Sequence, residues 1–324
     1  MDANTQTTRG ERPFRPELAP PPGQGSDAIA DVTHRRTYVF SDEIVLAVNV
    51  ALVTNRSLLV FGPPGSGKSS VAREIARELR WRYYEHVVTS RTEAADLQWR
   101  VDLVRRLADS QAKTLDADEN AYVAPGALWW AFDPETAKTL AWRASERGAF
   151  DADQTGDRAV VLVDEIDKAD VDLPNNLLVP LGSWRFTAPI GQVSVDRDHV
   201  PLVVITSNNE RDLPPAFVRR CVILNLPEPT HAHLVRVADA HLGRVVDGAD
   251  RDELFRAAAD IVVEHASATP GRQPSTAEYL DFVRACLELD VAPGSSEWQS
   301  LRAATLAKEP DPVGRRVTGT AAGA

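Results

Sequence analysis

The chain has little of three features that would each point to a particular class of protein. Among its 324 residues there are only two cysteines, Cys221 and Cys286, which lie far apart and match neither a metal-binding nor a redox spacing. We interpret both as small buried thiols in a reducing compartment. No apolar run approaches the roughly 20 residues that cross a bilayer, and no apolar signal segment follows Met1, so we expect a cytoplasmic protein without a membrane partner.

An excess of basic charge is also missing. Lysine and arginine number 36 against 47 aspartates and glutamates, which gives a formal net charge of −11. Nucleic-acid-binding surfaces gather Lys and Arg against phosphates, so this balance argues against general nucleic-acid binding while leaving room for local basic patches. His231 and His233 are two positions apart, which places them on different sides of a helix and argues against a shared metal.

The most informative feature that the chain does contain is residues 62–69, which read Gly-Pro-Pro-Gly-Ser-Gly-Lys-Ser. This is a complete phosphate loop of the form G-x-x-x-x-G-K-[ST]. The apolar run Ser57–Phe61 before it predicts a buried strand, and the spacing of Val71, Ile75 and Leu79 after it predicts a helix. Strand, glycine-rich loop and helix form the context in which this motif binds a nucleotide.

The chemistry of the loop assigns a role to each end of it. Backbone N–H groups would surround the phosphates, Lys68 would reach the β- and γ-phosphates, and the Ser69 hydroxyl would be a ligand of Mg²⁺. The residues expected to bind the nucleotide are Gly62, Pro63, Pro64, Gly65, Ser66, Gly67, Lys68, Ser69, Ser70 and, from further along the chain, Asp164.

Two later apolar runs end in polar residues that suit the same site. The run 159–163 ends in Asp164 and Glu165, where Asp164 can hold Mg²⁺ and Glu165 can polarise the water that attacks the γ-phosphate. The run 200–206 is followed by Asn208, which is a candidate to orient that water. The alternative for Asn208 is that it only caps a turn.

Residues 213–221 read Leu-Pro-Pro-Ala-Phe-Val-Arg-Arg-Cys, and with them the motifs resemble a family. Phosphate loop, Asp-Glu strand end, Thr-Ser-Asn strand end and Leu-Pro-x-Ala-x-x-x-Arg, in this order, are similar to the AAA+ ATPases of the MoxR and dynein-related branch. The resemblance covers roughly residues 40–308. It implies Walker A roles for Lys68 and Ser69, Walker B roles for Asp164 and Glu165, and the sensor-1 role for Asn208.

The resemblance also implies a residue that acts on a neighbouring subunit. Arg220, with Arg219 as second choice, aligns with the arginine that such proteins insert into the next subunit's site, where a guanidinium stabilises charge on the transferring phosphoryl group. The alternative is a solvated basic pair ahead of a strand at 222–226.

One residue of the family pattern is missing. Where the family carries a sensor-2 arginine at the start of a lid helix, this chain has Ser275 or Thr276. Arg272 is nearby but precedes Pro274, so it need not point at the nucleotide. Without that arginine the γ-phosphate has one contact fewer, so we expect an effect on the hydrolysis rate and on the coupling of the lid to the nucleotide state.

The predicted fold is α/β: an AAA+ P-loop core with a five-stranded, largely parallel sheet, plus a C-terminal α-helical lid. Residues 1–36 are expected to be a disordered, proline-rich tail or a docking peptide, 37–227 the nucleotide-binding core, 228–308 the lid over the nucleotide, and 309–324 a second disordered tail. The expected strands are 58–61, 83–88, 159–164, 202–206 and 222–226, and the expected lid helices are 231–242, 252–265, 276–289 and 297–307.

Two inserted segments have alternative interpretations. Residues 92–110 place Leu97, Val101, Val104 and Ala108 at helical spacing, which predicts either a plain amphipathic helix or an insert directed at a client or a central pore. Residues 177–191 predict a helix end followed by a hairpin. There, the two aromatic residues at 184 and 186 contact a client or fill a core.

The resemblance implies a Mg²⁺-dependent ATPase that forms a ring, expected to be a hexamer, and uses ATP to remodel or chaperone a protein partner. A von Willebrand A-domain protein is the partner that the family suggests. The second hypothesis is a nucleotide-gated assembly module that hydrolyses slowly, and no residue excludes GTP in place of ATP.

Overall fold

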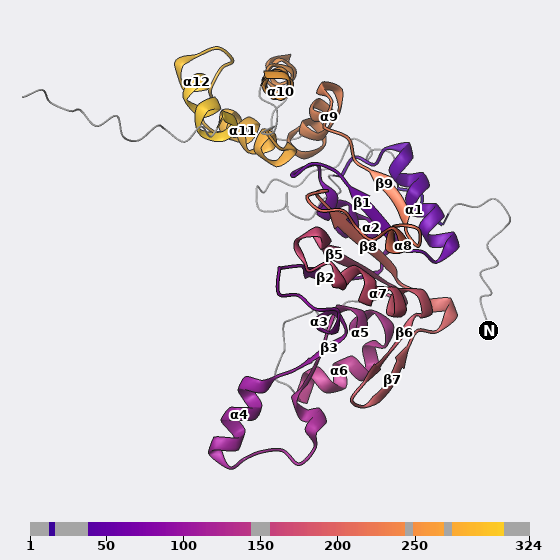
Figure 1. Ribbon diagram of the computed structural model, residues 1–324. Helices are drawn as coiled ribbons and strands as arrows, with labels where there is room; N and C mark the ends of the chain where they lie inside the picture. The colour runs from indigo at the N-terminus through magenta and orange to yellow at the C-terminus, as the bar shows by residue number, and fades with distance from the viewer. Residues whose placement is uncertain (1–12, 17–37, 144–155, 244–248, 269–273, 308–324) are drawn as a thin grey trace, which may run out of the picture. The chain divides into compact units, whose positions relative to one another are not determined.

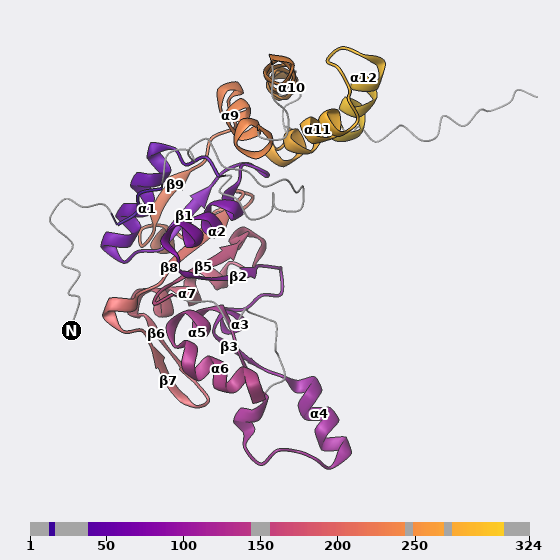
Figure 2. The same ribbon diagram turned by 180° about the vertical axis from the view of Figure 1, so that it is seen from behind.

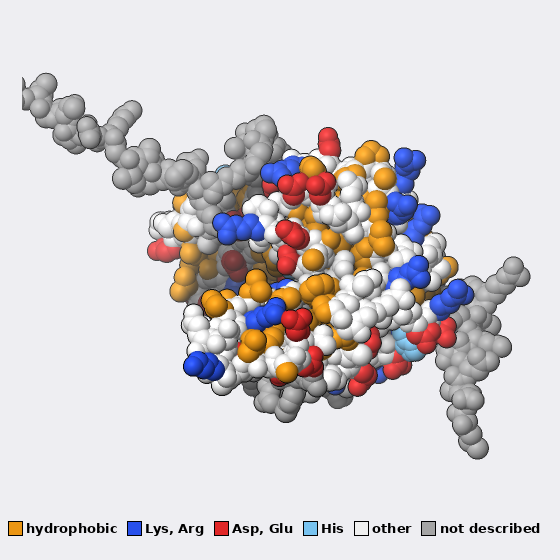
Figure 3. Space-filling model, turned by 60° about the horizontal axis from the view of Figure 1, so that its bottom comes forward, with side chains coloured by type: hydrophobic (Ala, Val, Ile, Leu, Met, Phe, Trp, Pro, Cys, Tyr) orange, Lys and Arg blue, Asp and Glu red, His pale blue; other side chains and the backbone are white. Residues whose placement is uncertain are grey.

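A computed structural model describes residues 13–16, 38–143, 156–243, 249–268 and 274–307. The chain divides into two compact units, Met1–Glu228 and Pro229–Ala324. No helix in the described ranges is long and apolar enough to cross a membrane. On the face shown in Figure 3, Lys and Arg side chains are interspersed with Asp and Glu side chains.

A five-stranded parallel sheet forms the centre of the first unit (Figure 1). Its strands are β1 (Leu58–Phe61), β2 (Arg82–Val87), β5 (Ala159–Asp164), β8 (Leu202–Ser207) and β9 (Val222–Asn225), in the order β2-β5-β8-β1-β9. Every neighbouring pair runs parallel. The predicted fold class and its sheet are therefore confirmed.

Apolar cores cover both faces of this sheet, which is why its strands are continuous apolar runs. Within β5, Val161 and Val163 belong to one core and Val160 and Leu162 to the other, because successive side chains of a strand alternate between faces. The helices of the unit are α1 (Asp42–Thr54), α2 (Lys68–Leu79), α3 (Ala94–Gln98), α4 (Leu103–Ala112), α5 (Ala127–Phe132), α6 (Pro134–Arg143), α7 (Asp172–Ser183) and α8 (Pro215–Val218). Helices α1 and α2 supply residues such as Val48 and Ile75 to the core that contains Val160 and Leu162, and α5 and α7 supply the core that contains Val161 and Val163.

The single helix predicted over 92–110 is wrong. The segment divides into α3, a short strand β3 (Trp99–Val101) and α4, and β3 pairs antiparallel with β4 (Val123–Pro125). Asp102 interrupts the helix because its side chain accepts a hydrogen bond from the Arg105 N–H and caps α4. The predicted apolar stripe does not form, since Val104 is 82% exposed and α4 has no buried residue. Helix α4 projects from the body of its unit in Figures 1 and 2.

The hairpin predicted after α7 is present as β6 (Arg185–Ala188) and β7 (Gly191–Ser194). Phe186 is buried at 6% exposure, and its ring packs against those of Trp129 and Phe132 at centroid distances of 5.9 and 5.6 Å. Of the two interpretations, filling a core therefore holds for Phe186. Trp184 is half-buried against Phe132.

The second unit consists of the helices α9 (His231–Leu242), α10 (Ala249–Ala268), α11 (Thr276–Glu288) and α12 (Ser296–Arg302), followed by a π-helical turn at Ala303–Ala307. The four helices predicted there are present. Their apolar faces share one core that contains Cys286. Cys221, in the first unit, is also buried, and both thiols are free, as predicted.

The predicted tails lie mostly outside the described residues, including all of 309–324. Within 1–36 the structure describes residues 13–16, and here the prediction of disorder is wrong. Phe14 is 1% exposed and is hydrogen-bonded to Asn49 of α1. A lone aromatic side chain in a polar, proline-rich stretch gave no periodic signal by which the contact could be found.

Candidate nucleotide site

The phosphate loop connects the carboxyl end of β1 to the start of α2, as the sequence predicts. Gly67 is the N-cap of α2 and has φ 88°, a left-handed conformation that favours glycine. At Gly62 a Cβ would lie 2.8 Å from the Leu226 carbonyl oxygen, so only glycine fits beside β9 there. Both glycines are therefore needed for the shape of the loop.

Lys68 lies inside this loop and is 6% exposed. Its Nζ donates hydrogen bonds to the carbonyl oxygens of Gly62 and Pro63, both at 2.8 Å. Burial lowers the pKa of the Lys68 ammonium, and the carboxylates of Asp164, Asp167 and other nearby acids oppose that shift. The positive charge is thus held where phosphate oxygens would enter.

Ser69 and Asp164 meet although they are 95 positions apart. The Ser69 Oγ lies 2.9 Å from each carboxylate oxygen of Asp164, and its hydroxyl donates a hydrogen bond to that carboxylate. Hydroxyl and carboxylate oxygens are the hard ligands that Mg²⁺ takes alongside nucleotide phosphates. The two residues therefore fit the magnesium role that the sequence predicts for them.

Sequence reasoning did not assign a role to Thr206, which connects the two acidic residues. Its buried Oγ1 donates to Asp164 Oδ1 at 2.5 Å and accepts a hydrogen bond from the Glu165 N–H at 2.8 Å. The signal in the sequence is the Thr-Ser-Asn strand end, in which Thr206 is a polar residue at the end of an otherwise apolar strand. Thr206 thus fixes the carboxylate of one residue and the backbone of the next.

Glu165 has an uncommon backbone conformation, with φ 60° and ψ 50°. A non-glycine residue held in the left-handed region costs about 1–3 kcal/mol, and such residues occur at active sites as well as at helix ends, as Asn55 and Arg80 show in this chain. The Glu165 carboxylate accepts a 2.5 Å hydrogen bond from Lys168 Nζ, a second partner that sequence reasoning missed. The ion pair holds the carboxylate against the next turn of the chain.

Asn208 follows β8 at the same edge of the sheet, where Ser207 is in register with Phe61 directly before the phosphate loop. Asp167, a buried residue that the sequence did not single out, accepts hydrogen bonds from the backbone N–H groups of Asn208 and Glu210, both at 3.0 Å. The Asn208 side-chain amide donates to Glu210 at 3.4 Å. Asp167, rather than the Asn208 side chain, therefore holds this turn.

Arg219 and Arg220 lie at the other end of the strands. They precede β9, whose first residue pairs with Leu58, whereas the phosphate loop leaves β1 after Phe61. A four-residue strand spans about 13 Å, so Arg220 is separated from its own loop by the length of the sheet.

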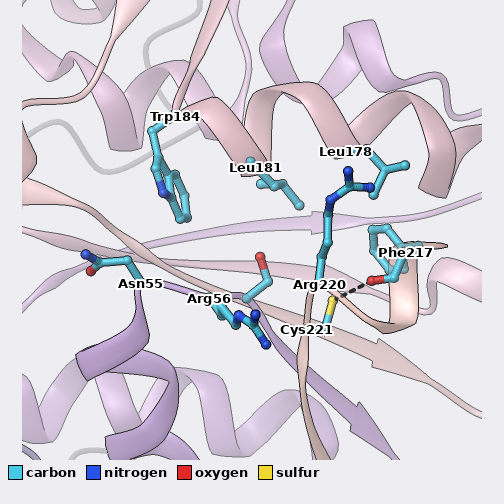
Figure 4. Close-up of a pocket in the computed structure, with 10 residues that line it drawn as sticks. Asn55, Arg56, Leu178, Leu181, Trp184, Phe217, Arg220 and Cys221 are labelled. Carbon is cyan, nitrogen blue, oxygen red and sulfur yellow. Dashed lines mark hydrogen bonds between the residues drawn. The ribbon is translucent and has the colours of Figure 1, made fainter. Parts of the chain in front are cut away.

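The two arginines also differ in their contacts. Arg219 Nε donates to the Pro215 carbonyl at 3.4 Å. Arg220 is exposed, and within the described part of the chain its guanidinium has no hydrogen-bond or ion-pair partner. It borders a pocket of about 220 Å³ and points toward Leu178 of α7, as Figure 4 shows.

Ser275 and Thr276, one of which stands where a sensor-2 arginine was expected, form the N-cap and the first residue of α11 in the second unit. The Ser275 Oγ accepts from the Glu278 N–H at 3.1 Å, and the Glu278 carboxylate accepts from the Ser275 N–H at 2.8 Å. This reciprocal capping box starts α11 at Thr276. Arg272 lies outside the described residues.

Comparison with known proteins gives one family. Residues 27–119 match the family described as the MoxR domain in the MoxR-vWA-beta-propeller ternary systems. No curated protein matches the chain significantly. Among solved structures, a mutant RuvB from Thermotoga maritima is similar, with 14% identity and a TM-score of 0.47 over 81% of this chain and 68% of that chain. The matched segment contains the whole phosphate loop and covers less than a third of the chain.

Proposed function

We propose that this protein is a Mg²⁺-dependent ATPase that assembles into a ring and remodels or chaperones a protein partner. The observation that carries the proposal is the contact between the Ser69 hydroxyl and the Asp164 carboxylate, with Lys68 in the adjoining loop. Three side chains suited to phosphates and magnesium thus meet at the carboxyl edge of a parallel sheet, where open α/β sheets bind their ligands.

Each residue has a distinct part in the proposed reaction. The loop N–H groups and the Lys68 ammonium bind the phosphates, and Lys68 exchanges its contacts with the Gly62 and Pro63 carbonyls for phosphate oxygens. Ser69 and Asp164 would hold Mg²⁺, which would supply positive charge to stabilise the phosphate oxygens.

The two residues that act on water lie at the same edge of the sheet. Glu165 accepts a proton from the attacking water, after its carboxylate leaves Lys168. Asn208 orients that water with its side-chain amide. Thr206 keeps Glu165 in place through the backbone N–H.

The position of Arg220 supports the proposed assembly into a ring. Because this arginine lies a strand length from its own phosphate loop, it can stabilise a transferring phosphoryl group only in another subunit. We therefore propose that Arg220 completes a neighbour's site in a closed ring, with six subunits as in the family resemblance.

The description of the matched family suggests the partner. It names MoxR domains in systems with vWA and β-propeller components, and we propose a von Willebrand A-domain protein as the partner of this chain. We place the contact on α4, because Leu103, Val104 and Leu107 are all exposed on a helix with no buried residue. Val104→Asp should weaken capture of a vWA partner while leaving the unfolding curve unchanged. Equal capture by the variant would exclude this surface.

ATP turnover tests the proposed activity. We expect Glu165→Gln to bind a fluorescent ATP analogue as tightly as wild type while hydrolysing ATP about 10²-fold more slowly, because it loses the base. Lys68→Ala should lose binding. Glu119→Gln, which makes the same chemical change at an exposed carboxylate, is the matched control and should hydrolyse normally. Equal turnover in wild type and Glu165→Gln would exclude catalysis at this site.

A second candidate is a nucleotide-gated assembly module with little hydrolysis. It is favoured by Ser275, whose side chain caps α11 where an arginine contact to the γ-phosphate was expected. Equally slow turnover in wild type and Glu165→Gln, with nucleotide-dependent oligomers in both, would support this module over the remodelling ATPase. Competition of ATP and GTP for the site would decide which base is used.

A further inference from the structure

Residues 13–16 pack on α1 through hydrogen bonds between a side chain of the helix and the backbone of the segment. The Phe14 N–H donates to Asn49 Oδ1 and the Phe14 carbonyl accepts from Asn49 Nδ2, both at 2.9 Å. The Asn49 amide also donates to the Val45 carbonyl at 2.7 Å, which fixes its orientation on the helix. The buried Asn49 side chain thus hydrogen-bonds both the N–H and the carbonyl of one residue, as a neighbouring strand does when a peptide adds to a sheet edge.

The Phe14 side chain fills an apolar site beside this pair. Its ring meets Phe40 edge-on with centroids 5.3 Å apart, and it belongs to the same core as Ile44 and Val48 of α1. Pro13 and Arg15 on either side of it are exposed. The contact therefore depends on the buried Phe14 ring and on the hydrogen bonds between the Phe14 backbone and the Asn49 side chain.

A chain of ring contacts connects this site to the phosphate loop. Phe40 packs against Tyr38 with centroids 4.8 Å apart. The Tyr38 ring in turn lies against the loop, since a Cβ on Gly67 would be 3.4 Å from Tyr38 Cε2. Gly67 is the N-cap of α2. Phe14, Phe40 and Tyr38 thus form a continuous path of packed rings from the N-terminal segment to the residue before Lys68.

We propose that α1 and Phe40 form a docking site for a proline-flanked aromatic peptide, that the chain's own residues 13–16 occupy it, and that this docking positions Tyr38 against the phosphate loop. Phe14 and Asn49 are positioning residues that act through Tyr38. Docking of the segment and binding of nucleotide then favour each other, and by linkage each strengthens the other by the same factor. The inference rests on the proposed function only in that the loop binds nucleotide.

The test uses the full chain with Phe14→Ala, which empties the site, and a labelled peptide of residues 10–19 added in trans. We expect Phe14→Ala to bind a fluorescent ATP analogue about 5-fold more weakly than wild type, at the lower end of coupling between linked sites. Saturating peptide should restore the affinity, and a peptide carrying Phe14→Ala should not. Arg15→Ala in the chain is the matched control and should bind nucleotide as wild type does, because that side chain is exposed.

Three further variants separate a positioning role from a structural one. Adding Asn49→Ala to the Phe14→Ala chain should abolish peptide binding. Tyr38→Ala should bind nucleotide weakly with the segment still docked, whereas Tyr38→Phe should behave as wild type; this pair tests the coupling even if Phe14→Ala fails to fold.

Unchanged nucleotide affinity in both Phe14→Ala and Tyr38→Ala would overturn the coupling, and peptide binding that survives Asn49→Ala would overturn the docking site. If the nucleotide affinity of wild type rises with protein concentration, residues 13–16 of a neighbouring copy occupy the docking site. That result would overturn occupation by the chain's own segment. If wild type binds no nucleotide, the proposed function fails, and peptide titration of the Phe14→Ala chain still decides the docking site.

Discussion

Replacing Thr206 with valine tests how the site holds its two acidic residues. Valine has nearly the shape of threonine, so the change removes one hydroxyl from a fully buried position. That hydroxyl donates to the Asp164 carboxylate at 2.5 Å and accepts from the Glu165 N–H at 2.8 Å. The variant therefore leaves a carboxylate oxygen without one donor and a backbone N–H without its acceptor.

The expected loss follows from these two contacts. A hydrogen bond to a charged group contributes about 1.5–3 kcal/mol and an unsatisfied N–H costs about 1–3 kcal/mol. Asp164 keeps the Ser69 hydroxyl, so we expect the free energy of unfolding to fall by about 2–4 kcal/mol. Turnover should fall by about 10-fold or more, because Glu165 loses the anchor of its left-handed backbone and a well-placed base contributes about 10²–10⁴-fold.

Urea denaturation and steady-state ATP hydrolysis measure the two effects. Thr206→Ser is the matched control because it keeps the hydroxyl and loses only a methyl group, which costs about 1 kcal/mol. It should retain most of the turnover. The reasoning is refuted if the valine variant unfolds and hydrolyses as wild type does, or if serine is as damaging as valine.

Three further predictions concern other parts of the chain. Arg220→Ala should bind ATP yet lose about 10³-fold in turnover, and mixing it with Lys68→Ala should restore some activity at mixed interfaces; no recovery would count against action in trans. Phe186→Ala should lower the free energy of unfolding by about 3–5 kcal/mol in urea, because the ring is buried against two aromatic neighbours, and a loss below about 1 kcal/mol would contradict its core role. Burial raises the pKa of the Cys221 and Cys286 thiols to about 11, so unfolded thiols lose their protons first and the free energy of unfolding should fall between about pH 9 and 11. Replacing both cysteines with serine should flatten this dependence, and an unaltered slope would refute it.

Elements marked by contiguous residues were predictable. The bounds of β1 and β5 agree with the apolar runs that precede the phosphate loop and the Asp-Glu pair, because a buried parallel strand needs apolar residues on both faces. The error at 92–110 has the opposite origin. The spacing of its apolar residues suits a helix, but Trp99–Val101 pairs with a strand more than 20 positions further along the chain. The spacing of residues within a segment carries no information about such a distant strand partner.

The residues that sequence reasoning missed share this dependence on distant contacts. Thr206 and Asp167 matter because of hydrogen bonds across neighbouring strand ends, and Phe14 because an asparagine 35 positions away accepts its N–H. Phe14 and Asp167 belong to no motif, and the Thr-Ser-Asn strand end that contains Thr206 pointed only to Asn208. Each acquires its role only when the sheet and α1 are assembled.

The sequence by itself determined which residues have the chemistry for phosphate and magnesium, because a phosphate loop is a local structure whose glycines, lysine and serine are adjacent in the chain. Only the tertiary structure decided which of the candidate site residues lie together. Parallel register brings Ser69 to Asp164 across 95 positions and places Arg220 at the opposite end of the same sheet. The physical reason is that strand pairing fixes which strand ends meet at each edge of the sheet. That pairing depends on contacts between segments far apart in the sequence.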